Sequence, residues 1–295
     1  MTVNSRTPTV RSLLFSINGS IIPVIWRRVV YTIALSLIVV WADFHVFSLK
    51  AGLNAAPLTL MGLTLAIFLG FRNTVAYQRW WEARTLWGGL IIAARNLTRQ
   101  TLAFLPDVPA DTRRELVHSL IGFAYLLKSH LRRSDPTADA EQWLAADSRS
   151  AVLAAPNRPS AALAQSGVAF ARAARSVDAS PILLAAIDGE LGKLSHVLAG
   201  CERIQGTPPP YTYLLLLHRT VHIYCFLLPF CLVGLMGWFT PLVVGVLAYT
   251  FFGLDALGDQ IEDPFDVLPN DLPLETYCAT VRNDLLALSG EPPAA

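Results

Sequence analysis

Four long apolar segments dominate the pattern of hydrophobic and polar positions along the chain. They comprise residues 29–46, 55–71, 221–239 and 241–254. A helix needs about 20 residues to cross the hydrocarbon core of a bilayer, and the usual range is about 17–25. The pattern therefore predicts four transmembrane helices, the last of them short, with the third and fourth contained in residues 214–258.

The sequence between the two apolar pairs follows another pattern. Residues 85–213 are rich in alanine, leucine and arginine, and residues 116–131 carry apolar side chains at helical spacing. Prolines interrupt this region, and Ser180 or Asp178 can cap a helix that begins at Pro181. We expect a cytoplasmic bundle of helices without strands.

Together these patterns predict an all-α polytopic membrane protein in four parts. Residues 1–84 hold the first two transmembrane helices, the second of which continues to residue 84. Residues 85–213 form the cytoplasmic helical region, and residues 214–258 hold the last two transmembrane helices. Residues 259–295 form an acidic cytoplasmic segment and the C-terminal tail.

The composition agrees with a lipid environment. Hydrophobic residues make up 53% of the chain and charged residues only 15%, against a usual charged share of about 25%. The net charge of +1 gives no basic patch, so we expect the lipid bilayer as a partner and no nucleic acid.

Basic residues are distributed unequally around the apolar segments. Lys50 is the one basic residue between the first two segments, and the turn between the last two carries no charge. Arginines gather instead before the first segment and after the second: Arg6, Arg11, Arg27, Arg28, Arg72, Arg79, Arg84, Arg95 and Arg99. By the positive-inside rule, both termini and the middle region are cytoplasmic. We expect a multi-pass protein of a bacterial-type inner (plasma) membrane.

The chain lacks the motifs that would identify an enzyme. It contains no GxSxG, P-loop, GxGxxG or HExxH pattern. The four cysteines show no CxxC spacing, so we expect reduced, structural thiols rather than disulfides or a zinc site. His218 and His222 have the spacing of a metal pair but no evident third ligand, so we interpret them as packing residues at the membrane interface.

The second apolar segment carries two parallel stripes of a helix. Leu63, Ile67 and Phe71 recur at every fourth position and form a bulky apolar stripe. Small residues recur one position earlier and form a helix-packing face: Gly62, Ala66 and Gly70. Both stripes can serve packing alone. Alternatively, symmetric copies pack through the small residues and present the bulky ones to a central axis, where an apolar ring can gate by dewetting.

Three stretches of sequence resemble the bestrophin family. Residues 71–84, FRNTVAYQRWWEAR, resemble the end of its second transmembrane helix, with an arginine and paired tryptophans after "GF". Residues 200–221 resemble the entry to the third transmembrane helix of bacterial members. Residues 260–274, QIEDPFDVLPNDLPL, resemble the acidic segment of the family. The three matches occur in the right order and span nearly the whole chain.

The resemblance implies a homopentameric ion channel with four transmembrane helices in each subunit and one central pore. Leu63, Ile67 and Phe71 align with the three apolar residues of the pore neck, and Ile182 with the cytoplasmic aperture. The partners are then the bilayer, other copies of the chain and permeating monovalent ions, with chloride and sodium both open. A secondary transporter and a receptor or scaffold without a conducting pore remain alternatives.

The acidic segment departs from the family pattern. In animal members this region binds calcium. Gln260 and Asp263 occupy the corresponding glutamine and asparagine positions, and Asp266 and Asp271 are further possible ligands. The run of aspartates in those members is replaced here by VLPND at residues 267–271. Calcium takes six to eight oxygen ligands, so the loss of carboxylates favours the alternative that Asp263, Asp266 and Asp271 cap turns and pair with arginines. We expect no required cofactor.

Overall fold

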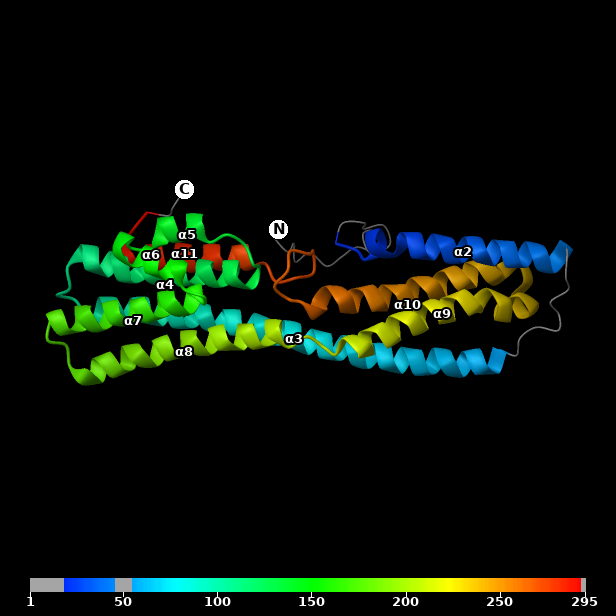
Figure 1. Ribbon diagram of the computed structural model, residues 1–295, viewed down its shortest axis with the longest axis horizontal. Helices are drawn as coiled ribbons and strands as arrows, with labels where there is room; N and C mark the ends of the chain where they lie inside the picture. Colours follow the sequence, from blue (N-terminus) through cyan, green and yellow to red (C-terminus); the bar gives the residue numbers. More distant parts are fainter. Residues whose placement is uncertain (1–18, 46–54, 293–295) are drawn as a thin grey trace. The chain divides into compact units, whose positions relative to one another are not determined.

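The computed structural model describes residues 19–45 and 55–292 of the chain (Figure 1). Within these ranges the regular structure is helical and contains no strand, as the sequence predicts. Three of the basic residues that contribute to the predicted orientation lie outside the described residues: Arg6, Arg11 and Lys50. The described part of the chain forms two compact units, and the helix α3 belongs to both of them.

The first unit contains the apolar helices. They are α2 (Ile22–His45), the beginning of α3 (Ala55–Phe104), α9 (Tyr211–Met236), the short 3-10 helix η2 (Gly237–Phe239) and α10 (Thr240–Glu262). The helices α2, α9 and α10 lie side by side (Figure 1). Gly237 has a positive φ of 51°, a conformation that glycine adopts without strain, and it allows the chain to turn back from α9 into α10.

These helices extend beyond the apolar segments read from the sequence. The helix α10 continues past residue 254 to Glu262, and α3 continues past residue 84 to Phe104. Both extensions contain charged residues, which have good or moderate helix propensity and therefore do not end a helix. Three helical stretches are long and apolar enough to cross a membrane: residues 22–45, 56–104 and 211–262. The last of these includes both α9 and α10.

The second unit is a bundle around the remainder of α3. Its other helices are α4 (Ala110–Leu131), α5 (Thr137–Trp143), α6 (Ala146–Ala154), α7 (Arg158–Ser176), α8 (Pro181–Gly206) and α11 (Leu274–Ser289). Fully buried Trp87, Phe123 and Phe170 lie in its apolar core. The Ser180 hydroxyl oxygen accepts a hydrogen bond from the Ile182 N–H at 3.3 Å, which confirms the predicted cap and start of α8.

All four cysteines are buried and free, as the sequence predicts. In the second unit, burial raises the pKa of both Cys201 and Cys278 to about 12. A thiol with such a pKa is almost entirely protonated at neutral pH and is a poor nucleophile. These two cysteines therefore act as small core residues.

Candidate functional site

The bulky stripe of α3 lies on the surface of the single chain. Leu63, Ile67 and Phe71 are exposed by 61%, 48% and 63%. On the other side of the same helix, Leu65 and Leu69 are almost fully buried in the apolar core of the first unit. The packing of α3 therefore leaves the predicted neck residues available to line a pore, to contact lipid or to contact another copy of the chain.

The small residues beside this stripe have different surroundings. A Cβ atom on Gly62 would lie 2.5 Å from the Tyr224 hydroxyl oxygen, so a close approach of α3 to α9 depends on this glycine. Gly70 has open space around it and Ala66 is exposed. Of the predicted helix-packing face, Gly62 packs within the chain, whereas Ala66 and Gly70 remain on its surface.

Ile182, the predicted cytoplasmic aperture, lies in the first turn of α8 in the second unit. Its side chain is exposed by 80%. The Ser180 cap and Pro181 fix the start of the helix, because proline already has the backbone angle of a first helical turn. An apolar side chain is thus held on the surface by a well-defined helix end.

The four candidate calcium residues follow one another at the end of α10 and after it. Gln260 is buried, and its side-chain oxygen accepts a hydrogen bond from the Asn270 amide at 2.6 Å. Asp263 is the C-cap residue of α10. An oxygen of Asp266 accepts from the Val267 N–H at 2.8 Å, and Asp271 is buried. Two of the candidate oxygens thus already have protein partners.

A cluster of charged side chains in the first unit lies immediately after the bulky stripe of α3, which we call the neck stripe. Arg72 is only 3% exposed, and its Nη1 donates to Asp255 at 3.0 Å. Its Nη2 pairs with Asp259 and lies 3.4 Å from a Glu262 oxygen. Asp255 is fully buried. A buried guanidinium that faces three carboxylates of α10 ties the end of the neck stripe to that helix. We call this set, with His218 and Arg28, the Arg72 cluster.

His218 and Arg28 connect the other helices to the same carboxylates. His218 Nδ1 lies 2.8 Å from an Asp255 oxygen, and its Nε2 lies 3.3 Å from an Asp259 oxygen. Both contacts are hydrogen bonds only when the imidazole carries two protons. Arg28 of α2 lies 3.9 Å from the same Asp255 oxygen. The helices α2, α3, α9 and α10 therefore all contribute to the Arg72 cluster.

The Arg72 cluster also contains side chains of the kinds that bind metal ions. Among the described residues, the metal-type side chains whose ligand atoms lie within 4.8 Å of one another are His218, Asp255 and Asp259. His222 is not among them, and its Nδ1 faces the His218 carbonyl oxygen at 2.7 Å. The guanidinium of Arg72 already bonds both carboxylates, so the cation of this cluster is supplied by the protein.

A glycine makes room for the Arg72 cluster. A Cβ atom on Gly258 of α10 would lie 2.5 Å from the Asn73 side-chain oxygen and 3.3 Å from Arg72 Cζ. The Asn73 amide also donates to the Leu254 carbonyl oxygen at 3.1 Å. The close approach of α3 to α10 at this level therefore requires a residue without a side chain.

We expect Gly258→Ala to destabilise the protein by about 1–3 kcal/mol, because the added methyl group must displace Asn73 and Arg72. Thermal unfolding in detergent would measure the effect. Gly189→Ala on α8 is the matched control, since a Cβ atom there meets nothing within 4 Å. The control should be neutral or stabilising by about 0.5–1 kcal/mol. Equal stabilities of the two variants would contradict the close approach.

The Arg72 cluster is not predicted by the pattern of apolar residues. The fourth apolar segment ends at residue 254, one position before Asp255, and the position of Arg72 after the second segment indicates orientation alone. A usable signal was present, because Asp255, Asp259 and Glu262 recur at helical spacing directly after an apolar helix. Charged residues at such a place usually have a partner of opposite charge.

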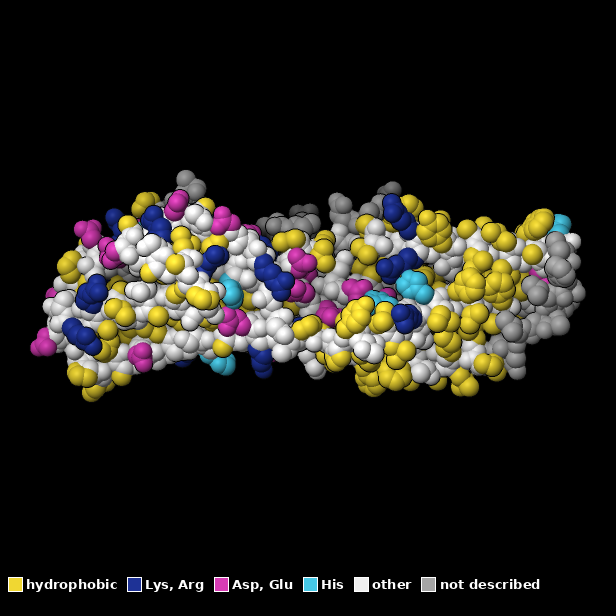
Figure 2. Space-filling view, viewed as in Figure 1, with side chains coloured by type: hydrophobic (Ala, Val, Ile, Leu, Met, Phe, Trp, Pro, Cys, Tyr) yellow, Lys and Arg dark blue, Asp and Glu magenta, His cyan; other side chains and the backbone are white. Residues whose placement is uncertain are grey.

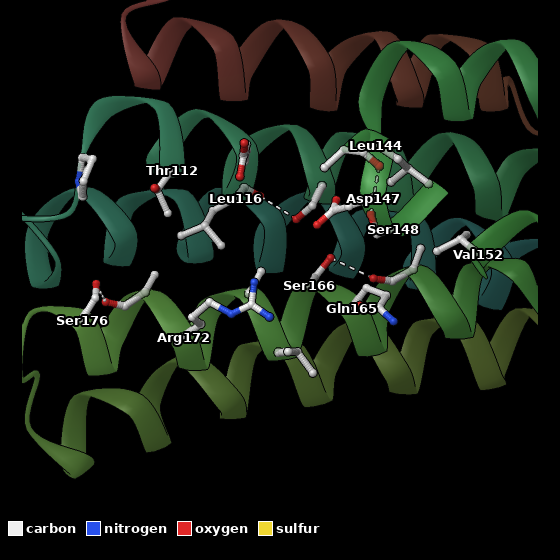
Figure 3. A pocket seen from close by; sticks show the side chains of 18 residues that line it. Thr112, Leu116, Leu144, Asp147, Ser148, Val152, Gln165, Ser166, Arg172 and Ser176 are labelled. Atoms are coloured by element: carbon white, nitrogen blue, oxygen red, sulfur yellow. Dashed lines mark hydrogen bonds between the residues drawn. The ribbon is translucent and has the colours of Figure 1, made fainter. Parts of the chain in front are cut away.

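A pocket of about 420 Å³ lies in the second unit between α4, α6 and α7 (Figure 3). Asp147 and Arg172 point into it from different helices, as Figure 3 shows. The Ser166 hydroxyl donates to the Ala162 carbonyl at 2.9 Å and so can only accept from a ligand. None of the neck, aperture or calcium candidates lines this pocket.

The long apolar helices and the buried charges between them define an α-helical membrane protein. Residues 1–287 match the family described as bacterial/fungal bestrophin protein. The chain belongs to this family, which confirms the resemblance found in the sequence.

Known members of the family are similar over almost the whole chain. A voltage-dependent anion channel-forming protein of Mesorhizobium japonicum is 40% identical over 288 residues, which cover 97% of this chain and 92% of the relative. YneE of Escherichia coli K12, described in the same words, is 37% identical and covers 94% and 91%. A crystal structure of a bestrophin homolog from Klebsiella pneumoniae has a TM-score of 0.87 at 39% identity, with 91% of this chain and 100% of that chain covered.

Proposed function

We propose that the chain forms an ion channel in which five copies surround a central pore and conduct small monovalent ions passively. The neck of this pore is lined by rings of Leu63, Ile67 and Phe71, and its cytoplasmic aperture by Ile182. The observation that carries the proposal is the exposed apolar stripe of α3, whose other face is buried in the core of the chain. Family membership and the description of the relatives as channel-forming proteins support it.

In this proposal the chain crosses a bacterial inner membrane four times, through α2, the first part of α3, α9 and α10. Both termini and the second unit are then cytoplasmic. Arg27 and Arg28 near the start of α2 favour this orientation, as does the absence of charge in η2 between α9 and α10. Gly62, Ala66 and Gly70 serve helix packing, the last two of them between copies.

The neck does not choose ions by charge, because its three rings are apolar. Selectivity then arises from ring diameter, ion hydration and the charges at the mouths of the pore. The names of the relatives, which are described as anion channel-forming proteins, support chloride as the conducted ion.

The experiment that tests this function is single-channel recording of the purified protein in a planar bilayer with a NaCl gradient. We expect discrete conductance steps that reverse near the chloride equilibrium potential. Reversal near the sodium potential would keep the channel and reject chloride. A silent bilayer with inserted pentamers would favour a transporter or a scaffold. A detergent-corrected mass equal to the 32.3 kDa monomer would reject the pentamer.

We also propose that conduction does not require calcium. The Gln260 oxygen is engaged by Asn270 and one Asp266 oxygen by the Val267 N–H, which leaves fewer oxygens than the six to eight that calcium takes. A chelator added to both sides of the bilayer should leave the open probability unchanged. A clear fall in open probability that added calcium reverses would show that the acidic segment binds the ion after all.

A further inference from the structure

A groove of about 470 Å³ runs along the outside of α2, α9 and α10 in the first unit. Its walls are mainly apolar, and six of its lining residues are Tyr31, Leu35, Ile223, Phe226, Leu227 and Phe252. Tyr31, Ile223 and Phe226 are each exposed by more than half of their surface. All three helices belong to stretches apolar enough to cross a membrane, so the groove lies at the depth where lipid can reach it.

The groove also contains a partly exposed basic group. Arg28 lines it with 40% of its side chain accessible, and its buried Nη1 faces Asp255 without a hydrogen bond. The Asp255 oxygen that pairs with this nitrogen is 3.9 Å away, beyond hydrogen-bond distance. His222 lines the groove as well; its Nδ1 donates to the His218 carbonyl oxygen, and its Nε2 is a donor for a ligand only when the ring carries two protons. A partly exposed guanidinium at the edge of an apolar groove fits an anionic group attached to an apolar chain.

Further basic residues stand close to Arg28 and His222 in the sequence. Arg27 precedes Arg28, Arg219 lies one turn before His222, and both are exposed. Figure 2 shows arginine and histidine side chains gathered on the first unit, beside a broad apolar surface. Both α2 and α9 carry these residues in their first half, which is where a headgroup region would lie on the basic, cytoplasmic side. The positive charge of these residues and their depth in the membrane therefore both fit a site for a lipid headgroup.

We propose that this groove binds an anionic phospholipid. One acyl chain lies against Leu35, Ile223 and Phe226, and the phosphate accepts hydrogen bonds from Arg28. Arg27 and Arg219 add electrostatic attraction at the membrane surface. Basic pockets between transmembrane helices are a known way to hold acidic lipid headgroups, and here the exposed part of the Arg28 guanidinium donates to the phosphate while Nη1 stays beside Asp255. The inference rests on the membrane location and not on ion conduction.

Native mass spectrometry of the delipidated protein tests the proposal. The probes are phosphatidylglycerol, phosphatidylcholine with the same acyl chains, and inorganic phosphate. We expect phosphatidylglycerol to bind at least about fivefold more tightly than phosphatidylcholine, since one arginine near the surface is worth about a fivefold change in affinity. Inorganic phosphate should neither bind nor compete at comparable concentration, because it cannot use the apolar walls.

Two variants, each with a control, distinguish the contribution of the lipid headgroup to binding from that of the acyl chain. Arg28→Gln should remove most of the preference for phosphatidylglycerol, whereas Arg99→Gln, an exposed arginine of the second unit, should not. Ile223→Trp should fill the groove and weaken both lipids, whereas Val246→Trp, on exposed surface of α10 outside the groove lining, should not. If Arg28→Gln does not fold, the proposal is tested by comparing Ile223→Trp with Val246→Trp and by comparing the three probes on the wild-type protein.

Equal binding of the two lipids by the wild-type protein would overturn the proposal, as would competition by inorganic phosphate alone. An unchanged preference in Arg28→Gln would do the same. Because binding is measured by mass, a protein that binds lipid without conducting would contradict the channel and leave this site intact. A conducting protein without lipid preference would support the channel and overturn this site.

Discussion

Ile67→Ala is expected to raise the single-channel conductance by about twofold or more, because it widens the apolar constriction of the proposed pore and makes it easier to wet. The reversal potential should stay the same, since no charge is added or removed. Ile67→Asp should in contrast shift the reversal potential toward that of the cation, because it places a ring of carboxylates in the neck. Recordings in a planar bilayer would measure both effects.

The control for Ile67 is Ile38→Ala on α2. Ile38 is also an exposed isoleucine of a membrane helix, with 63% of its surface accessible, but it lies outside the neck stripe. Its replacement should leave the conductance unchanged. Currents equal to those of the wild type in both Ile67 variants would show that the neck stripe does not line the conduction path. The stripe would then be a packing or lipid-facing surface.

Arg72→Gln is expected to destabilise the protein by roughly 3–5 kcal/mol, which is the usual cost of removing one partner from a buried ion pair. Asp255 is fully buried and would lose the arginine that lies 3.0 Å from one of its oxygens. A large fall in the thermal unfolding temperature in detergent would be the measured result. The double variant Arg72→Gln with Asp255→Asn should recover part of the loss, because it leaves no uncompensated carboxylate at that position.

A surface ion pair provides the comparison for Arg72. Arg203 pairs with Glu82 in the second unit, and both side chains are largely exposed. Arg203→Gln should cost no more than about 0.2–1 kcal/mol, since solvent screens such a pair. Similar losses for Arg72→Gln and Arg203→Gln would mean that burial adds nothing to the strength of the Arg72 cluster.

The periodicity of the sequence was sufficient for the helical fold and for the shared stripe of Leu63, Ile67 and Phe71. It was not sufficient for the helix ends. Apolar runs indicate where a helix meets lipid, but α10 continues to Glu262 through a mixed segment, DALGDQIE at residues 255–262, whose charged residues end the apolar run. Because hydropathy alone sets the end of the fourth segment at residue 254, it gives no indication that Asp255 pairs with Arg72.

The partners in the Arg72 cluster could not have been paired from the sequence. Arg72 and Asp255 are 183 positions apart, and no local rule of spacing connects them. Their contact depends on the packing of α3 against α10, which in turn depends on Gly258. A glycine inside a helix indicates only that some close approach is possible. Which helix approaches is a property of the three-dimensional packing.

The length of the neck stripe has an electrical consequence. At the 1.5 Å rise of a helix, the stripe from Leu63 to Phe71 is about 12 Å long. If the narrow apolar neck is the main resistance of the proposed pore, most of the membrane voltage falls over this length rather than over the roughly 30 Å of hydrocarbon. The local field is then about 2.5 times stronger than the bilayer average. An applied potential would therefore act mainly on the ion inside the neck.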